Sequence, residues 1–167
     1  SSHFWADPSS PAVTDYNFHV ITQELPLTFF PGARSFSPTN LQVPGTNVQP
    51  LVNSSRQSFG ETDQQKAHFD KGIDLEGPLT IMVVALRQPV DQKDDIYAKN
   101  RGGIPLPSKG HDANPVTAKS RIAVIGDSDF ATNSFFHVMG NGRLFLNTVN
   151  YLASKENLIG LEPRARD

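Results

Sequence analysis

The longest unbroken apolar runs of the chain lie in its second half. "GPLTIMVVALR" at 77–87 contains eight successive apolar or β-branched residues from Leu79 to Leu86, introduced by Gly-Pro. "RIAVIG" at 121–126 is a second, shorter run of the same kind. Runs of this length and composition predict two strands that are covered on both faces of a sheet.

A helical pattern follows the second run. In "NGRLFLNTVNYLASKEN" at 141–157 the apolar face recurs at helical spacing, so one side of the helix can dock on a sheet. Asn141 suits the N-cap and Asn157 the helix stop, and "LIGLEP" at 158–163 predicts a closing strand. The face consists of Leu144, Phe145, Thr148, Val149 and Leu152.

The remaining segments are short, polar or rich in breakers. Prolines divide residues 1–50 into short strands and turns, and "VQPLVNSS" at 48–55 predicts another short strand. Residues 88–120 are polar and full of Gly and Pro, which predicts a long exposed loop. The order strand, turn, helix, strand predicts a single α/β domain over residues 1–167, with helices flanking a mixed sheet.

Composition excludes several classes of function. The formal net charge is −2 with both signs interspersed, so no field is present that would recruit nucleic acid or anionic lipid. The chain has no cysteine, which excludes disulfides, thiolate metal sites and cysteine nucleophiles. No run approaches the roughly 20 apolar residues that cross a bilayer.

The acidic turn that follows the second strand is the main candidate site. Asp127, Ser128 and Asp129 come directly after Gly126, and the carboxyl ends of strands are where ligands gather in α/β proteins. One interpretation is a serine hydrolase, but Ser128 needs a histidine base and only His137 follows it. Another is a metal or phosphoacceptor site, which requires a further carboxylate from another loop.

The interpretation favoured for the turn is structural. Asp127 or Ser128 would cap a helix that follows the strand, where free amides and the helix dipole attract oxygen atoms and negative charge. Capping and ligand binding are compatible, so a binding surface is expected here from Asp127, Ser128, Asp129, Asn133 and Asn141.

Neither the histidines nor the phenylalanines indicate a further site. The five histidines are scattered without metal-ligand spacing, and no metal or cofactor is expected. Phe29, Phe30, Phe135 and Phe136 are expected in a core or an interface.

A second candidate surface lies earlier in the chain. Ser58 stands three places before Glu61, as in a capping box, although Gly60 weakens a helix start. A turn that displays Ser54, Ser55 and Ser58 as part of a binding surface is the alternative.

Three segments together resemble a known family. They are "LVNSSRQSFGETD", "DLEGPLTIMVVAL" and "RIAVIGDSDFATNSFF…MGNGRLFLNTVNYLASKENLIGLEPRARD". Their order is similar to that in the extracytoplasmic auxiliary proteins of gliding-motility-type ABC transport systems. The resemblance is dense over the last two thirds of the chain, and Phe59 and Tyr151 stand where the family frequently has tryptophan.

The resemblance implies a Rossmann-like, class I glutamine amidotransferase-like fold. It implies that the chain is the C-terminal part of a larger extracytoplasmic (periplasmic) domain, anchored by transmembrane helices outside this chain, beside ABC permease and ATPase subunits. Because the chain lacks the cysteine that glutamine amidotransfer requires, that activity is not expected.

The resulting expectation is a non-catalytic binding domain that recognises a partner protein or an envelope glycan, with no nucleic acid partner. The alternative is a hydrolase of carbohydrate or phosphate esters that uses Asp127, Ser128 and Asp129.

Overall fold

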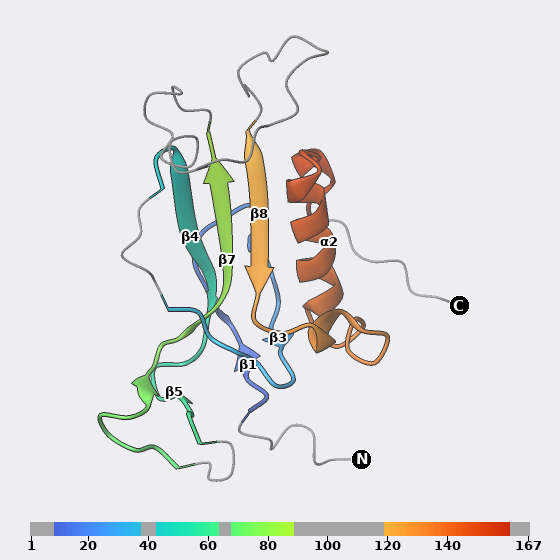
Figure 1. Ribbon diagram of the computed structural model, residues 1–167. Helices are drawn as coiled ribbons and strands as arrows, with labels where there is room; N and C mark the ends of the chain where they lie inside the picture. Colours follow the sequence, from blue (N-terminus) through green and yellow to red (C-terminus); the bar gives the residue numbers. More distant parts are fainter. Residues whose placement is uncertain (1–8, 38–42, 64–67, 89–118, 161–167) are drawn as a thin grey trace, which may run out of the picture.

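The centre of the molecule is a four-stranded sheet (Figure 1). The computed structural model describes residues 9–37, 43–63, 68–88 and 119–160. The sheet has the order β2-β4-β7-β8, and every pair in it is antiparallel. Its strands are β2 (Asp15–Tyr16), β4 (Thr46–Asn53), β7 (Thr80–Arg87) and β8 (Ser120–Ile125).

This arrangement is mixed α/β, as expected, but the sheet itself is antiparallel where a mixed sheet was expected. Antiparallel neighbours need no crossover helix between them, so β4 and β7 pair directly over most of their length. A Rossmann-like arrangement, which needs parallel strands, is not confirmed.

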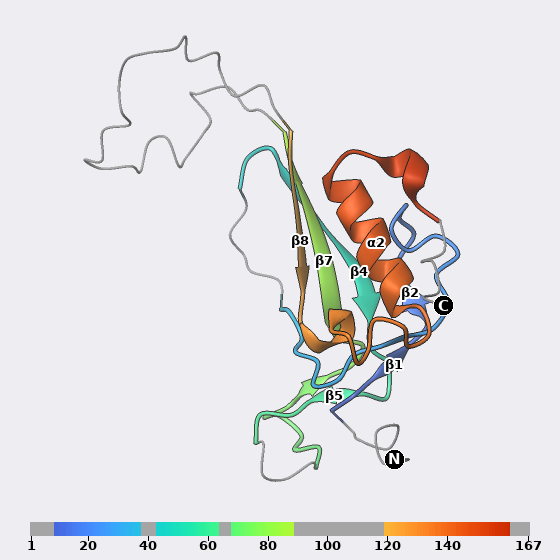
Figure 2. The ribbon, with the colours of Figure 1, turned by 90° about the vertical axis from the view of Figure 1, so that its right-hand side faces the viewer.

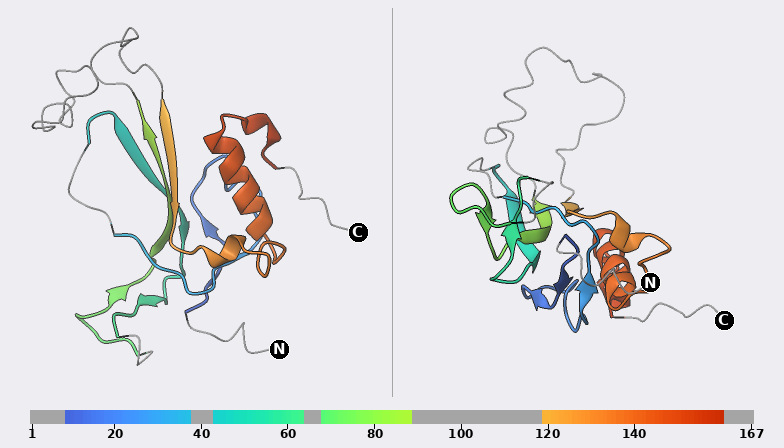
Figure 3. Two further views of the ribbon diagram at one scale, coloured as in Figure 1. Left: turned by 45° about the vertical axis from the view of Figure 1, so that its right-hand side comes forward. Right: turned by 90° about the horizontal axis from the view of Figure 1, so that it is seen from below.

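Two small pairs complete the described strands. β1 (Ala12–Val13) pairs with β3 (Thr28–Phe29), and β5 (Phe59–Gly60) pairs with β6 (Leu75–Glu76), both antiparallel. β5 projects from the lower end of the sheet on the side away from the long helix (Figures 1 and 3). The short strands agree with the breaker-rich sequence of the first 50 residues.

One face of the sheet is covered by α2 (Asn141–Leu152) (Figure 2). Met82 and Val84 of β7 and Leu144 of α2 are almost fully buried at this interface. Phe29 and Phe30 are buried as expected, whereas Phe135 and Phe136 are half-buried. The hydrophobic core comprises Val13, Ile21, Phe30, Leu51, Val52, Ile81, Met82, Val84, Phe130, Leu144 and Tyr151.

The opposite face has no helix among the described residues, so the prediction of two strands buried on both faces is wrong for β8. The residues of β8 alternate between exposed and half-buried, and Ile122 and Val124 are 55% and 42% exposed. Both side chains lie on the face away from α2, because Ala123 and Ile125 pack against the core. The two central strands contain successive buried residues, Leu51 and Val52 in β4 and Ile81 and Met82 in β7.

The long helix begins at Asn141 as expected but ends earlier. Gly140 is its N-cap residue, so the expected N-cap role of Asn141 is wrong. The helix stops at Leu152, and Ser154 has a left-handed φ of 55° where the helix was expected to continue to Asn157.

The segment after the helix is a 3-10 turn, η3 (Glu156–Leu158). Residues 158–160 therefore do not form the expected closing strand, and 161–163 lie outside the described residues. Most of the predicted loop at 88–120 also lies outside them, as residues 89–118. Within the described part of the chain, no helix has the length and apolar character needed to cross a membrane.

Candidate functional site

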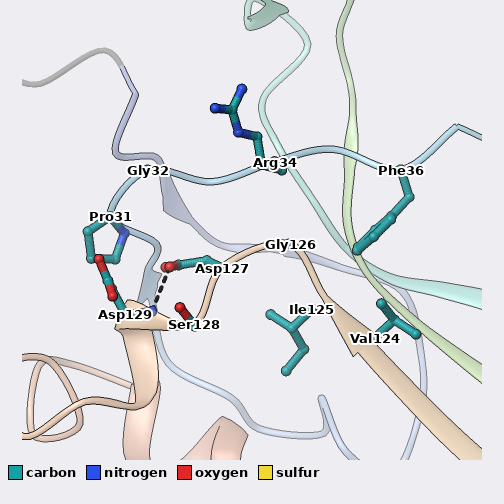
Figure 4. A pocket seen from close by; sticks show the side chains of 10 residues that line it. All are labelled: Pro31, Gly32, Arg34, Phe36, Val124, Ile125, Gly126, Asp127, Ser128 and Asp129. Carbon is teal, nitrogen blue, oxygen red and sulfur yellow. Dashed lines mark hydrogen bonds between the residues drawn. The ribbon is translucent and has the colours of Figure 1, made fainter.

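The acidic turn forms one wall of an open pocket of about 470 Å³ at the end of β8 (Figure 4). The other wall is the segment 31–36, which crosses the end of the strand. We call this segment the strap. The pocket is lined by Pro31, Gly32, Arg34, Phe36, Val124, Ile125, Gly126, Asp127, Ser128 and Asp129.

Main-chain hydrogen bonds fasten the strap to the sheet. The Arg34 N–H donates to the Gly126 carbonyl oxygen at 2.7 Å, and the Phe36 N–H donates to that of Thr80 at 2.8 Å. The Gly126 N–H in turn donates to the carbonyl of Ile81 on β7 at 2.9 Å. A Cβ atom at position 126 would lie 1.8 Å from the Arg34 carbonyl oxygen, so only glycine allows this approach.

Asp127 is half-buried and its two carboxylate oxygens differ. Oδ1 accepts a hydrogen bond from the Asp129 N–H at 2.8 Å (Figure 4). Oδ2 is buried and has no hydrogen-bond partner in the described part of the molecule. Burial raises the pKa of Asp127, and the nearby charge of Asp129 raises it further. Hydrogen bonds from the Asp129 and Phe130 amides lower the pKa but do not cancel this increase.

The helix that the acidic turn was expected to cap is a single 3-10 turn, η2 (Asp129–Ala131). Ser128 makes no side-chain capping bond to it. Asp127 instead closes a local turn through the Asp129 amide. The capping prediction is therefore wrong: no α-helix directly follows the strand, the N-cap residue Ser128 makes no side-chain bond, and the Asp127 carboxylate bonds the Asp129 amide in a local turn. Ser128 and Asp129 are exposed to solvent.

Arg34 and an apolar floor complete the pocket. The Arg34 guanidinium is exposed and points away from the carboxylates, while the ring of Phe36 points toward Val124 (Figure 4). The pocket therefore offers carboxylates, a hydroxyl and a guanidinium around an apolar patch. Such a mixture suits recognition of a polar ligand or a protein surface.

None of the described histidines lines the pocket. Of the described histidines, His137 stacks edge-on against Phe136 at a centroid distance of 5.0 Å, and His19 packs in the same way against Tyr151 at 4.8 Å. The Ser128 hydroxyl thus has no histidine base beside it among the residues that the structure describes. Among the described residues, no group of three His, Asp or Glu could hold a metal ion.

Asn141 and Asn133 do not join the acidic turn in lining the pocket. Asn141 is fully buried, and its amide bonds both main-chain groups of Phe29 and the Phe130 carbonyl. Its expected place on the binding surface is therefore wrong, because its polar atoms are used inside the fold. Asn133 is exposed but is not a lining residue.

Ser58 also lies outside the pocket, in the turn before β5. Its Oγ bonds the Ser54 Oγ at 2.6 Å and donates to the Ser55 carbonyl at 2.8 Å. No helix starts here, and the Glu61 carboxylate accepts from the amides of Asp63 and His68 instead of forming a capping box. The alternative of a serine turn is the one observed, although Ser54 is buried.

The strap is the part of the site that sequence reasoning missed. Pro31-Gly32 signals a turn, and Gly32 has a left-handed φ of 75°. Nothing in the sequence indicates that this turn meets a strand end more than 90 residues later.

Comparison with family models, with curated proteins and with solved structures finds no match. The family resemblance consequently depends on the quoted motifs.

Proposed function

We propose that the protein is a non-catalytic binding domain of a membrane-anchored ABC transport system. In this proposal it works at the extracytoplasmic (periplasmic) face of the membrane beside the permease and ATPase subunits. It recognises a partner protein or an envelope glycan through the pocket between the strap and the acidic turn. The observation that carries the proposal is an open pocket in which the exposed Ser128 and Asp129 lie beside the half-buried Asp127, Arg34 and an apolar floor.

The roles of the other motif residues support the choice of this pocket. Gly77 donates its N–H to the Ser58 carbonyl at 2.8 Å, and a Cβ there would lie 2.6 Å from the Ser58 Oγ. Gly126 accommodates the strap, and Asn141 bonds Phe29. These residues are used in packing, so the exposed Ser128 and Asp129 and the half-buried Asp127 are what the motifs leave for a ligand.

The relation to the glutamine amidotransferase-like fold belongs to the same proposal. A Rossmann-like core would need parallel strands in addition to the antiparallel sheet of the described residues. The motifs, rather than the sheet order, support this relation.

The hydrolase of carbohydrate or phosphate esters is the second candidate. It is favoured by one feature, the raised pKa of Asp127, because a carboxyl group that remains protonated to a higher pH can act as a general acid. The binding function is preferred because none of the three described histidines lines the pocket beside Ser128.

The decisive experiment compares binding by the wild-type chain and an Asp127→Ala/Asp129→Ala variant. Tagged chains would be incubated with solubilised membranes that contain the permease and ATPase, and recovery of these two subunits would be quantified; glycan binding would be followed on envelope polysaccharide. We expect at least a tenfold loss in the variant. An Asp15→Ala/Glu76→Ala variant, which changes the net charge equally at exposed positions, should bind like wild type.

Equal binding by the wild type and the Asp127→Ala/Asp129→Ala variant would reject the pocket as the contact site. Turnover of generic ester, phosphate or glycoside substrates that is lost in Ser128→Ala or Asp127→Asn would replace the binding function with the hydrolase.

A further inference from the structure

β8 is an edge strand, and its outer edge lies beside a free flank of α2 (Figure 2). The sheet order ends at β8, so β7 is its neighbour on one side only. In the described part of the chain, no strand pairs with the other side. An open edge of this kind presents main-chain donors and acceptors to any strand that approaches.

The register identifies which main-chain groups point outward. β7 and β8 pair without a bulge from Met82↔Ile125 to Arg87↔Ser120, and the Gly126 N–H donates to β7. Antiparallel residues alternate between facing the neighbour and facing away. Arg121, Ala123 and Ile125 therefore direct their N–H and C=O groups outward, and these groups have no hydrogen-bond partner among the described residues.

Within the described residues, β8 itself lacks the sequence features by which natural edge strands prevent strand addition. β8 contains no proline, and its single charge, Arg121, is engaged within the fold. The Arg121 guanidinium bonds the Tyr151 carbonyl and the Glu156 carboxylate, and lies 4.4 Å from the centroid of the Tyr151 ring. An unprotected edge favours pairing with a further strand.

An apolar stripe on α2 accompanies this edge. Phe145, Val149 and Leu152 are 37%, 45% and 40% exposed, and their spacing of four and three residues places them on one flank of the helix. The other flanks contact the sheet and the segment 21–29, through bonds such as Asn147 Nδ2 to the Ile21 carbonyl. At about 100° per residue the exposed stripe lies on the flank opposite Asn147, and its Phe145 also contacts the rings of Phe130 and Phe136. We call the edge and the stripe the β8–α2 flank.

We propose that the β8–α2 flank binds a second copy of this chain. The two β8 strands pair antiparallel about a twofold axis at Ala123, which makes one continuous eight-stranded sheet from two four-stranded ones. Ala123 then lies opposite Ala123 of the second copy, and Arg121 lies opposite Ile125. The three outward N–H groups of each copy meet the three outward carbonyls of the other.

Of the possible registers between two β8 strands, only this one gives every outward N–H and C=O group a partner on the second copy. An axis at Ala123 keeps both α2 helices on the same face, so their apolar stripes come together. On the other face Ile122 lies opposite Val124 of the second copy, which pairs two apolar side chains. No like charges lie directly opposite each other. A twofold contact also closes on itself, which limits the assembly to a dimer.

The first test is the oligomeric state of the purified 167-residue chain, measured by sedimentation over a range of concentrations. We expect a dimer. Ala123→Pro removes an outward N–H and leaves the bonds to β7 intact. We therefore expect the dissociation constant of the dimer to increase at least tenfold. Val149→Glu places charge in the stripe and should act likewise. Phe18→Glu, at an apolar residue that is 91% exposed, is the control and should remain dimeric.

The second test reports the register and uses the natural absence of cysteine. Ile122→Cys and Val124→Cys chains, mixed and mildly oxidised, should form a covalent dimer, whereas either chain alone should not. Circular dichroism and thermal melts would verify that each variant folds. A monomer at all concentrations, an open-ended polymer, a dimer that survives both Ala123→Pro and Val149→Glu, or cross-linking by a single variant alone would overturn the proposal.

Discussion

Asn141 at the start of α2 and Phe29 of β3 are joined by two hydrogen bonds across 112 positions of the chain. The Asn141 Oδ1 accepts from the Phe29 N–H at 2.8 Å, and its Nδ2 donates to the Phe29 carbonyl at 2.9 Å. The Asn141 amide thus bonds the N–H and C=O groups of Phe29 as the main chain of a neighbouring strand would. Both residues are buried. A residue that resembled part of a binding surface is instead what attaches the helix to the small sheet.

We expect Asn141→Ala to destabilise the protein by about 2–4 kcal/mol, because two buried main-chain groups of Phe29 lose their partner. Urea unfolding followed by circular dichroism would measure the change. Asn150 lies on the same helix and donates an exposed bond of 3.3 Å to the Leu158 carbonyl of η3, so Asn150→Ala should cost about 0.5 kcal/mol or less. Equal effects of the two substitutions would contradict the role of Asn141.

Gly126→Ala should detach the strap from the end of β8. The new Cβ would overlap the Arg34 carbonyl oxygen, and we expect a loss of about 3 kcal/mol in the free energy of unfolding. Hydrogen exchange at the Arg34 amide should accelerate, since its acceptor is the Gly126 carbonyl. Gly32→Ala is the comparison: its left-handed φ costs about 1–2 kcal/mol, and no atom within 4 Å opposes the methyl group. Unchanged exchange at Arg34 in Gly126→Ala would contradict the proposed contact.

Asp127 should make stability depend on pH in the direction opposite to a salt-bridged carboxylate. Burial raises its pKa in the folded state, so folding favours the protonated form. The stabilising contribution is complete below the unfolded pKa of about 3.9 and is lost as the pH rises through the folded value. The stability of wild type relative to Asp127→Asn should therefore increase on acidification from neutral pH, as measured by unfolding at several pH values. A difference that stays constant with pH would refute a raised pKa.

The serine turn before β5 offers a test that separates packing from binding. The Ser54 Oγ accepts a hydrogen bond from the Leu79 N–H at 2.7 Å and also bonds Ser58. Ser54→Ala should cost about 1–3 kcal/mol because the Leu79 amide loses its acceptor, and Ser58→Ala should cost about 1 kcal/mol. Neither variant should weaken binding at the pocket between the strap and the acidic turn. Binding would be measured with the solubilised membranes used for the Asp127→Ala/Asp129→Ala variant. A binding loss in folded Ser58→Ala would return this turn to the site.

Local patterns were sufficient to predict several elements. The apolar runs at 79–86 and 121–125 are strands, and the 3.6-residue pattern after Asn141 is a helix, because periodicity depends on residues that are near in sequence. The pocket at the end of the second strand was predicted for the same reason, since the acidic residues follow the strand directly.

The sequence by itself therefore determined the types of the main elements, the absence of cysteine chemistry and the place of the acidic turn. Only the tertiary structure decided that β7 and β8 are antiparallel, that β8 is the edge of the sheet formed by the described strands and that Asn141 is buried. It also decided that the strap forms the second wall of the pocket. Strand direction, edge position and side-chain partners depend on contacts between residues that are far apart in the chain, such as Asn147 and Ile21 at 126 positions, and hydrophobic periodicity is insensitive to them.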